Sequence, residues 1–182
     1  MKRIILSVTF CFVAFFLSAQ EESDRIRSNE VSIDVFDLAF LRTIDISYEY
    51  IKIPDLGFGL TTRYCFDNED LSYDERYSIT PFLRYYFFSK KDYGSKGFYV
   101  ESFMKFYGGE FSEYYYDYNF NYSHTDKKQF FDAAFGVGLG FKYVSKNGYT
   151  LDLNIGGGRP LGLSDHSNEL VGRGCISFGY RF

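Results

Sequence analysis

The side chains in this sequence that are able to support catalysis lie in two polar segments. Ser123 and His124 are adjacent, and His166, Ser167 and Glu169 form a second group. A serine nucleophile beside a histidine base, oriented by a carboxylate, is the arrangement used for acyl transfer and hydrolysis. That chemistry requires the groups to lie within hydrogen-bonding distance of one another, which proximity in sequence does not provide. We therefore predict no catalytic residues and no enzymatic activity.

Metal and cofactor sites are not expected either. His124 and His166 have no further ligands at metal-binding spacing around them. Gly136, Gly138 and Gly140 resemble a dinucleotide-binding loop in composition, but they recur at every second residue of a strand-like pattern, and no helix follows to hold a pyrophosphate. Glycines at this spacing instead leave space beside one face of a strand. The sequence therefore predicts no metal and no cofactor.

Charged side chains recur on one face of several segments in which apolar and polar residues alternate. Successive side chains of a strand point to opposite sides, so residues two apart share a face. If the polar faces lined a narrow interior, opposite charges there would have to pair. Six acids and six bases on these faces predict a charge-balanced polar plug rather than a gated ion path. These residues are Asp34, Asp45, Glu49, Glu101, Asp132, Asp152, Arg63, Arg84, Lys105, Lys142, Arg173 and Arg181.

Eight alternating segments would position these charges. Each has an apolar and a polar face, and residues typical of turns separate one segment from the next. Segments of about ten residues with this alternation are typical of strands that cross a membrane as a closed barrel. We therefore predict eight antiparallel strands with the apolar face toward lipid. Their expected ranges are Glu30 to Leu38, Thr43 to Ile51, Leu56 to Phe66, Tyr77 to Phe88, Gly97 to Gly109, Phe131 to Val144, Tyr149 to Gly157, and the last twelve residues from Val171.

The beginning of the sequence indicates export. Lys2 and Arg3 precede an apolar run from Ile4 to Leu17, and small residues follow as far as Ala19. This order is typical of a cleaved secretory signal peptide, and the run is too short for a membrane-spanning helix. We therefore expect a signal peptide at residues 1–19, a short segment at 20–29 and a barrel domain at 30–182.

The last strand indicates how the barrel closes. Phe178, Tyr180 and Phe182 share one face with Ile176 and end the sequence on an aromatic residue. An apolar strand with an unpaired edge invites aggregation, whereas in a closed barrel it pairs with the first strand. Removal of the first 19 residues takes the formal net charge from −4 to −6, which disfavours nucleic acid as a partner. The 22% aromatic content suits the aromatic girdles of a membrane barrel.

The links between the predicted strands alternate in length after the second strand. Short links follow the second, fourth and sixth strands and long ones follow the third, fifth and seventh, as in barrels with short periplasmic turns and long extracellular loops. The longest link, Glu110 to Phe130, offers aromatic contact area of the kind enriched at interfaces. An equally favoured alternative is that the strands extend beyond the membrane and these tyrosines pack on one another. The tyrosines are Tyr114, Tyr115, Tyr116, Tyr118 and Tyr122.

Together these features resemble the small eight-stranded bacterial outer-membrane barrels of OmpA/OmpX type. More narrowly, Asn29-Glu30-Val31, Asp45-Ile46-Ser47-Tyr48-Glu49-Tyr50 and Ile79-Thr80-Pro81-Phe82 resemble an exported barrel family of unknown function. The resemblance covers the mature chain and implies an all-β, up-and-down transmembrane barrel in a Gram-negative outer membrane. In barrels of this type the assembly machinery recognises the closing aromatic strand, which here carries Phe178, Tyr180 and Phe182. The narrower family implies no activity.

We therefore expect a non-enzymatic membrane protein with a structural or adhesion-like role through its extracellular loops. Its expected partners are membrane lipids, the barrel-assembly machinery and an extracellular partner of unknown identity, and the barrel is expected to be a monomer. The alternative is a lipid-modifying enzyme at the extracellular rim, because some small outer-membrane barrels use a histidine and a serine there. A soluble lipocalin-like barrel is a third interpretation, but it would keep its apolar face inside.

Overall fold

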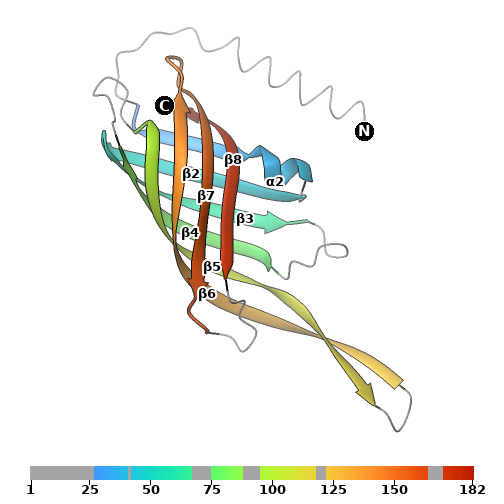
Figure 1. Ribbon diagram of the computed structural model, residues 1–182. Coiled ribbons are helices and arrows are strands. Elements are labelled where there is room, and N and C mark those ends of the chain that lie inside the picture. The colour runs from blue at the N-terminus through green and yellow to red at the C-terminus, as the bar shows by residue number, and fades with distance from the viewer. Residues whose placement is uncertain (1–26, 41, 67–74, 88–94, 118–121, 164–169) are drawn as a thin grey trace, which may run out of the picture.

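The computed structural model describes residues 27–40, 42–66, 75–87, 95–117, 122–163 and 170–182. Eight antiparallel strands form a closed barrel in which each strand pairs with its neighbours in sequence and β8 pairs with β1 (Figure 1). The predicted fold class is therefore confirmed, whereas the predicted signal peptide lies outside the described residues. The strands are β1 (Asn29–Asp34), β2 (Thr43–Ile53), β3 (Leu56–Cys65), β4 (Glu75–Tyr86), β5 (Gly97–Asp117), β6 (Tyr122–Val144), β7 (Tyr149–Pro160) and β8 (Val171–Arg181).

Asn29, the first residue of β1, meets Phe182, which follows β8, where these two strands close the barrel. The backbone N–H of Asn29 donates to the carbonyl of Phe182 over 3.1 Å, and the N–H of Phe182 donates back over 2.7 Å. From there the β1–β8 pairing continues as far as Asp34 and Ser177. We call this end of the barrel the closing end. The opposite end, where the long β5–β6 hairpin protrudes in Figure 1, is called the hairpin end.

Polar side chains point into the barrel and apolar side chains point out of it. In β6, Val137 and Leu139 are 63% and 62% exposed, whereas Asp132 and Lys142 are at most 1% exposed. A water-soluble lipocalin-like barrel has the reverse arrangement, with its apolar residues inside. The predicted assignment of the two faces is therefore confirmed, and the lipocalin-like interpretation does not fit.

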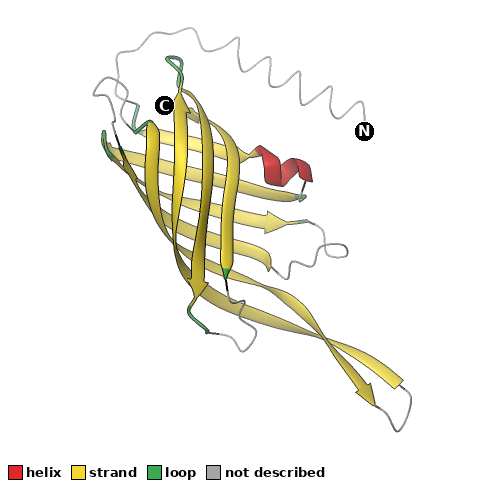
Figure 2. Cartoon of the chain, in the orientation of Figure 1, coloured by secondary structure: helices red, strands yellow, loops and turns green. Residues whose placement is uncertain are grey.

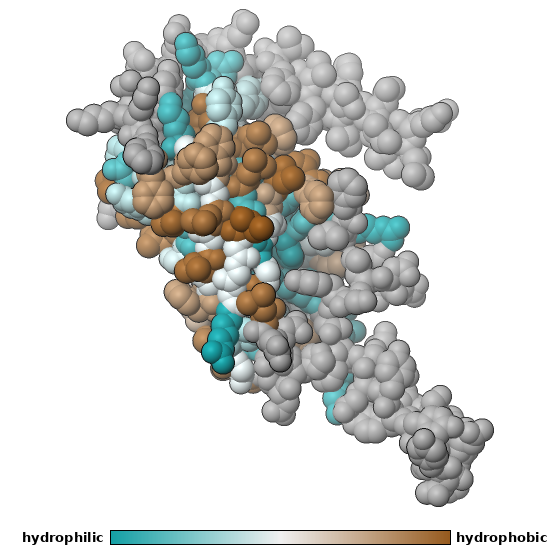
Figure 3. Space-filling model, in the orientation of Figure 1, coloured by the Kyte–Doolittle hydropathy of each residue, from teal (hydrophilic) through white to brown (hydrophobic). Residues whose placement is uncertain are grey.

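The outer surface carries an aliphatic band between aromatic rings, and brown hydrophobic residues cover the front strands in Figure 3. Near the closing end, Tyr50 packs against Phe58 with their ring centroids 5.3 Å apart, and Phe98 packs against Phe141 at 5.0 Å. Aromatic girdles that flank an apolar band are the pattern of membrane-spanning barrels. No helix among the described residues is long and apolar enough to cross a membrane. Exposed aliphatic residues of the band include Leu60, Leu83, Leu139, Leu153 and Ile155.

The first strand is shorter than predicted. A strand from Glu30 to Leu38 was expected, but β1 ends at Asp34 and a six-residue helix, α2 (Val35–Phe40), follows. The Asp34 carboxylate accepts the N–H groups of Phe36 and Asp37 over 2.8 and 3.2 Å, and this helix cap replaces further strand pairing. The prediction that the first strand continues through residues 35–38 is therefore wrong. The helix lies against β2 and β8 beyond the end of β1.

The fifth and sixth strands are longer than predicted. The expected loop from Glu110 to Phe130 is largely strand, because β5 continues to Asp117 and β6 begins at Tyr122 (Figure 2). Residues 110–117 pair with residues 122–129 and form a two-stranded ribbon, called the β5–β6 ribbon from here on. The backbone thus follows the alternative in which the strands extend beyond the barrel. The side chains of residues 111–127 lie outside the described part of the structure.

Aromatic rings fill the barrel interior beside glycines of the neighbouring strand. Tyr99 pairs with Gly140 and Phe103 pairs with Gly136 across β5 and β6. A methyl group on either glycine would overlap the facing ring, so the glycines create the space that the rings occupy. This confirms that the glycines make room in the lumen. It also explains why apolar and polar residues alternate poorly in β5, since Tyr99 and Phe103 are buried inside the barrel.

Candidate functional site

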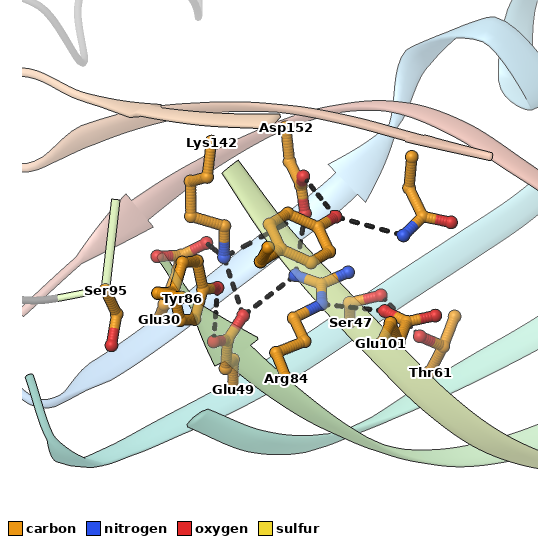
Figure 4. A network of polar contacts seen from close by, with 12 residues as sticks. Glu30, Ser47, Glu49, Thr61, Arg84, Tyr86, Ser95, Glu101, Lys142 and Asp152 are labelled. Atoms are coloured by element: carbon orange, nitrogen blue, oxygen red, sulfur yellow. Dashed lines mark hydrogen bonds and ion pairs between the residues drawn. The ribbon is translucent and has the colours of Figure 1, made fainter. Parts of the chain in front are cut away.

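The closing half of the lumen is filled by a network of three bases and three acids, called the closing network; Figure 4 shows it around Arg84 and Lys142. Arg84 extends from β4 and contacts Glu49 on β2 at 2.9 Å and Asp152 on β7 at 2.7 Å. Lys142 on β6 contacts Glu49 at 2.6 Å and Glu30 on β1 at 2.7 Å. Arg181 on β8 binds Glu30 at 2.9 Å. These six side chains are at most 4% exposed, so the network closes the lumen at this level.

Two tyrosines complete the hydrogen bonds of the closing network. The hydroxyl of Tyr86 donates to Glu49 over 2.7 Å (Figure 4). The hydroxyl of Tyr99 donates to Asp152 over 2.7 Å. The Arg84 guanidinium lies over the Tyr99 ring, 4.5 Å from its centroid. Buried charges are tolerated where their remaining hydrogen-bonding groups are satisfied, and these contacts satisfy them. The network is therefore suited to hold the barrel together rather than to pass ions.

The hairpin half of the lumen holds three more bases, each paired with at least one carboxylate. Arg63 binds Asp45, with Nη2 2.8 Å from the nearer carboxylate oxygen, and also contacts Asp37 of α2. Arg173 Nε lies 2.8 Å from Glu101, which also binds Arg84 at 2.7 Å and so connects this half to the closing network. In the third pair, Lys105 Nζ lies 2.7 Å from Glu75. Ten of the twelve charged residues expected to point inward take part in the contacts of the two halves, and the other two, Asp34 and Asp132, are buried.

The helix carboxylate at this end has an unusual protonation equilibrium. Burial raises the pKa of Asp37 to about 6, because desolvation of the carboxylate outweighs the attraction of the Arg63 guanidinium. The nearby carboxylates Asp34 and Asp45 raise the pKa further. Asp37 is therefore the group of α2 whose charge changes in mildly acidic solution.

Three acidic residues of the lumen escaped the sequence analysis. Glu30 occupies the same strand face as Ser32 and Asp34, and that spacing could have identified it. Asp37 was missed because the helix was missed, and Glu75 was missed because the fourth strand was expected to start at Tyr77. With these three, the described lumen has nine acids and six bases, so the expected charge balance does not hold.

A cavity of about 630 Å³ occupies the hairpin half of the lumen. It is lined by side chains of α2, β3, β4 and β8, among them Asp37, Arg63, Glu75 and Arg173, and by Asn154 of β7. Its volume falls in the range of small-molecule sites. Because the closing network blocks the other half, the cavity ends inside the barrel.

The candidate catalytic residues are not brought together by the described structure. Ser123 and His124 lie on the β5–β6 ribbon, where their backbones pair with Tyr116 and Tyr115. The second group, residues 166–169, lies outside the described residues, as does Tyr118. Among the described residues, no three His, Cys, Asp or Glu side chains are arranged to hold a metal ion.

Comparison with solved structures identifies the class of fold. The crystal structure of the N-terminal β-barrel domain of Pseudomonas aeruginosa OprF is similar to this chain, with 17% sequence identity and a TM-score of 0.50. The match covers 86% of this chain and 98% of that one. The chain therefore has the eight-stranded barrel fold of the OmpA type, and the resemblance to such barrels is confirmed at the level of fold. No family model and no curated protein matches the chain, and the narrower resemblance to a family of unknown function stays a prediction.

Proposed function

We propose that the protein is an integral protein of the bacterial outer membrane that contacts an extracellular partner through its β5–β6 ribbon and catalyses no reaction. The ribbon is the observation that carries this proposal. It continues beyond the last pairs that β5 and β6 make with the rest of the barrel, which are Glu75 with Gly109 and Ala134 with Pro160. Eight residues of strand span about 25 Å, so the ribbon reaches well past the barrel.

The ribbon has properties of a contact surface. Neither of its two edges is paired with another described strand, and unpaired strand edges are sites at which extended segments of other chains bind. An isolated two-stranded ribbon also has little stability in water. Contact with a partner would therefore stabilise it, and its tyrosine-rich sequence supplies contact area for that purpose.

The apolar outer band and the aromatic girdles support the proposal that the barrel lies in a lipid bilayer. Phe178 and Tyr180 of β8 and the following Phe182 are 39–55% exposed on the outer face, which suits the proposed recognition by the assembly machinery. With both chain ends at the periplasmic side, the ribbon would lie outside the cell. The closing network and the lack of assembled catalytic groups in the described residues support a role without chemistry.

Fractionation and surface labelling test this proposal. The protein should copurify with outer membranes and migrate differently on gels before and after heating, because an intact barrel stays compact in detergent. An epitope tag between Asp117 and Tyr122, where the ribbon turns, should be reached by antibody on intact cells. Recovery as a soluble periplasmic protein would contradict the membrane assignment, and a tag detected only in permeabilised cells would contradict the orientation.

A further inference from the structure

The two halves of the lumen differ in charge. The closing network contains three acids and three bases, namely Glu30, Glu49, Asp152, Arg84, Lys142 and Arg181. The described hairpin half contains six acids and three bases, namely Asp34, Asp37, Asp45, Glu75, Glu101, Asp132, Arg63, Lys105 and Arg173. The excess of negative charge therefore lies in the half that contains the cavity.

Two hydrogen-bond acceptors beside this cavity are unused. Glu75 and Asn154 both line it, and they are only 8% and 7% exposed. Within the described residues, the Oε1 atom of Glu75 and the Oδ1 atom of Asn154 have no hydrogen-bond partner. Buried acceptors without a donor are costly, because they have lost water without gaining a replacement.

The bases of the wall do not supply those donors. Arg63 is occupied by Asp37 and Asp45, and Lys105 contacts the other oxygen of Glu75. Arg173 faces Glu101 and lies between the rings of Phe82 and Phe103, 5.6 and 5.4 Å from their centroids. A ligand that carries both positive charge and N–H donors would satisfy the acceptors and offset the charge excess together.

We propose that the hairpin-half cavity binds a small organic ammonium ion of the polyamine class. A volume of about 630 Å³ accommodates a molecule of that size, and its apolar wall, which includes Phe36 and Cys175, accommodates the methylene chain between charged nitrogens. A bare metal ion fits less well, since no described group of three ligating side chains converges. This site goes beyond the proposed surface role and does not depend on it.

Spermidine is the probe for this site. The full chain, folded in an uncharged detergent at pH 7.5 and low salt, is titrated with spermidine by isothermal calorimetry, with detergent alone as the blank. We expect one saturable site. Glu75→Gln, which keeps an acceptor for Lys105 and removes the charge, should weaken binding about tenfold or more. Absence of saturable heat with the unaltered protein would overturn the proposal.

Glu110→Gln is the matched control. Glu110 loses the same charge but pairs with Arg76 at the exposed rim, outside the cavity lining, so binding should change by less than about twofold. Equal weakening by both variants would show attraction by the overall charge and would overturn the proposal. Displacement of spermidine by an equal concentration of Mg²⁺ would likewise show a general cation site.

A variant that is expected to bind spermidine more tightly tests the site even if Glu75→Gln impairs folding. Lys105→Gln removes the base that competes for Glu75 and should tighten spermidine binding about threefold or more. Impaired folding cannot produce tighter binding. A Lys105→Gln protein that keeps heat-modifiable migration but binds spermidine more weakly would contradict the proposal.

Discussion

The ammonium group of Lys142 lies 2.6 Å from a carboxylate oxygen of Glu49, although 93 residues separate the two in sequence. Lys142 belongs to β6 and Glu49 to β2, which are four strands apart in a closed barrel of eight and therefore stand on opposite walls. Their contact crosses the full width of the lumen. An ion could not pass at this level without breaking it, and the walls are tied together by buried charge.

Replacement of Lys142 by methionine should strongly destabilise the barrel. The variant leaves Glu49 and Glu30 buried with one partner fewer each, and loss of one member of a buried pair costs about 3–5 kcal/mol. Reversible urea unfolding in lipid bilayers measures the change. Arg76→Met breaks a half-exposed pair with Glu110 and should cost less than about 1 kcal/mol. Equal costs for the two variants would show that the lumen network contributes little.

Much of the fold could be predicted because strand alternation is a local property of the sequence. Eight segments and the outward set were identified from residues two apart, as in Val137 and Leu139. The end of β1 could not be predicted in this way, since alternation continues past Asp34 in the sequence although its carboxylate caps a helix there, and the contact of Asp37 with Arg63 on another strand is not a local property. Likewise the inward position of Tyr99 depends on Gly140 of the neighbouring strand. The register of the strands and the closure of the barrel decide which side chains meet across the lumen, and neither can be derived from a single sequence.

Substitutions at neighbouring β6 positions distinguish the lipid face from the lumen. Leu139→Arg places a charge against lipid and should cost about 2–4 kcal/mol near the midplane. Gly138→Ser faces the lumen and should cost less, about 1 kcal/mol, because the added Cβ would meet the Ile155 carbonyl oxygen at 3.2 Å, a tight contact that a shift of a few tenths of an ångström relieves. Urea titration in bilayers again provides the measurement. A serine variant less stable than the arginine variant would mean that the faces are exchanged.

Gly140→Ala should be worse tolerated than Gly138→Ser although it adds only a methyl group. The methyl would overlap the Tyr99 ring, displace its hydroxyl from Asp152 and lie 2.7 Å from the backbone carbonyl oxygen of Leu153, at a cost of about 2–3 kcal/mol. The double variant Gly140→Ala with Tyr99→Leu should cost less than the sum of the two single variants, because the smaller side chain vacates the space beside residue 140. If the two losses are simply additive, the contact between ring and glycine is not the cause.

Asp37 should make the hairpin end sensitive to pH. Its folded-state pKa of about 6 is higher than the ordinary 3.8, so between these values the folded protein binds a proton that the unfolded chain has released. Stability from this group is therefore greatest below about pH 4 and declines as the pH rises through 6. Asp37→Asn should abolish this dependence and leave stability at pH 7 equal or higher. A large loss of stability at pH 7 would show instead that the Arg63 pair outweighs burial.

The tyrosines of the β5–β6 ribbon should matter for contact and not for barrel assembly. Beyond Gly109 on β5 and Ala134 on β6, these two strands have no pairing with β4 or β7. Replacing Tyr114, Tyr115, Tyr116 and Tyr118 with serine should therefore change the free energy of unfolding by less than about 1 kcal/mol, as for surface substitutions. Adhesion of whole cells, or retention of a partner on the immobilised protein, should fall sharply.

A shortened variant is the control for this prediction. Joining Glu110 to Gln129 through Asn-Gly forms a tight hairpin without the ribbon. If that variant folds and still binds the partner, the contact surface lies elsewhere, and if the tetra-serine variant fails to assemble, the tyrosines pack within the fold.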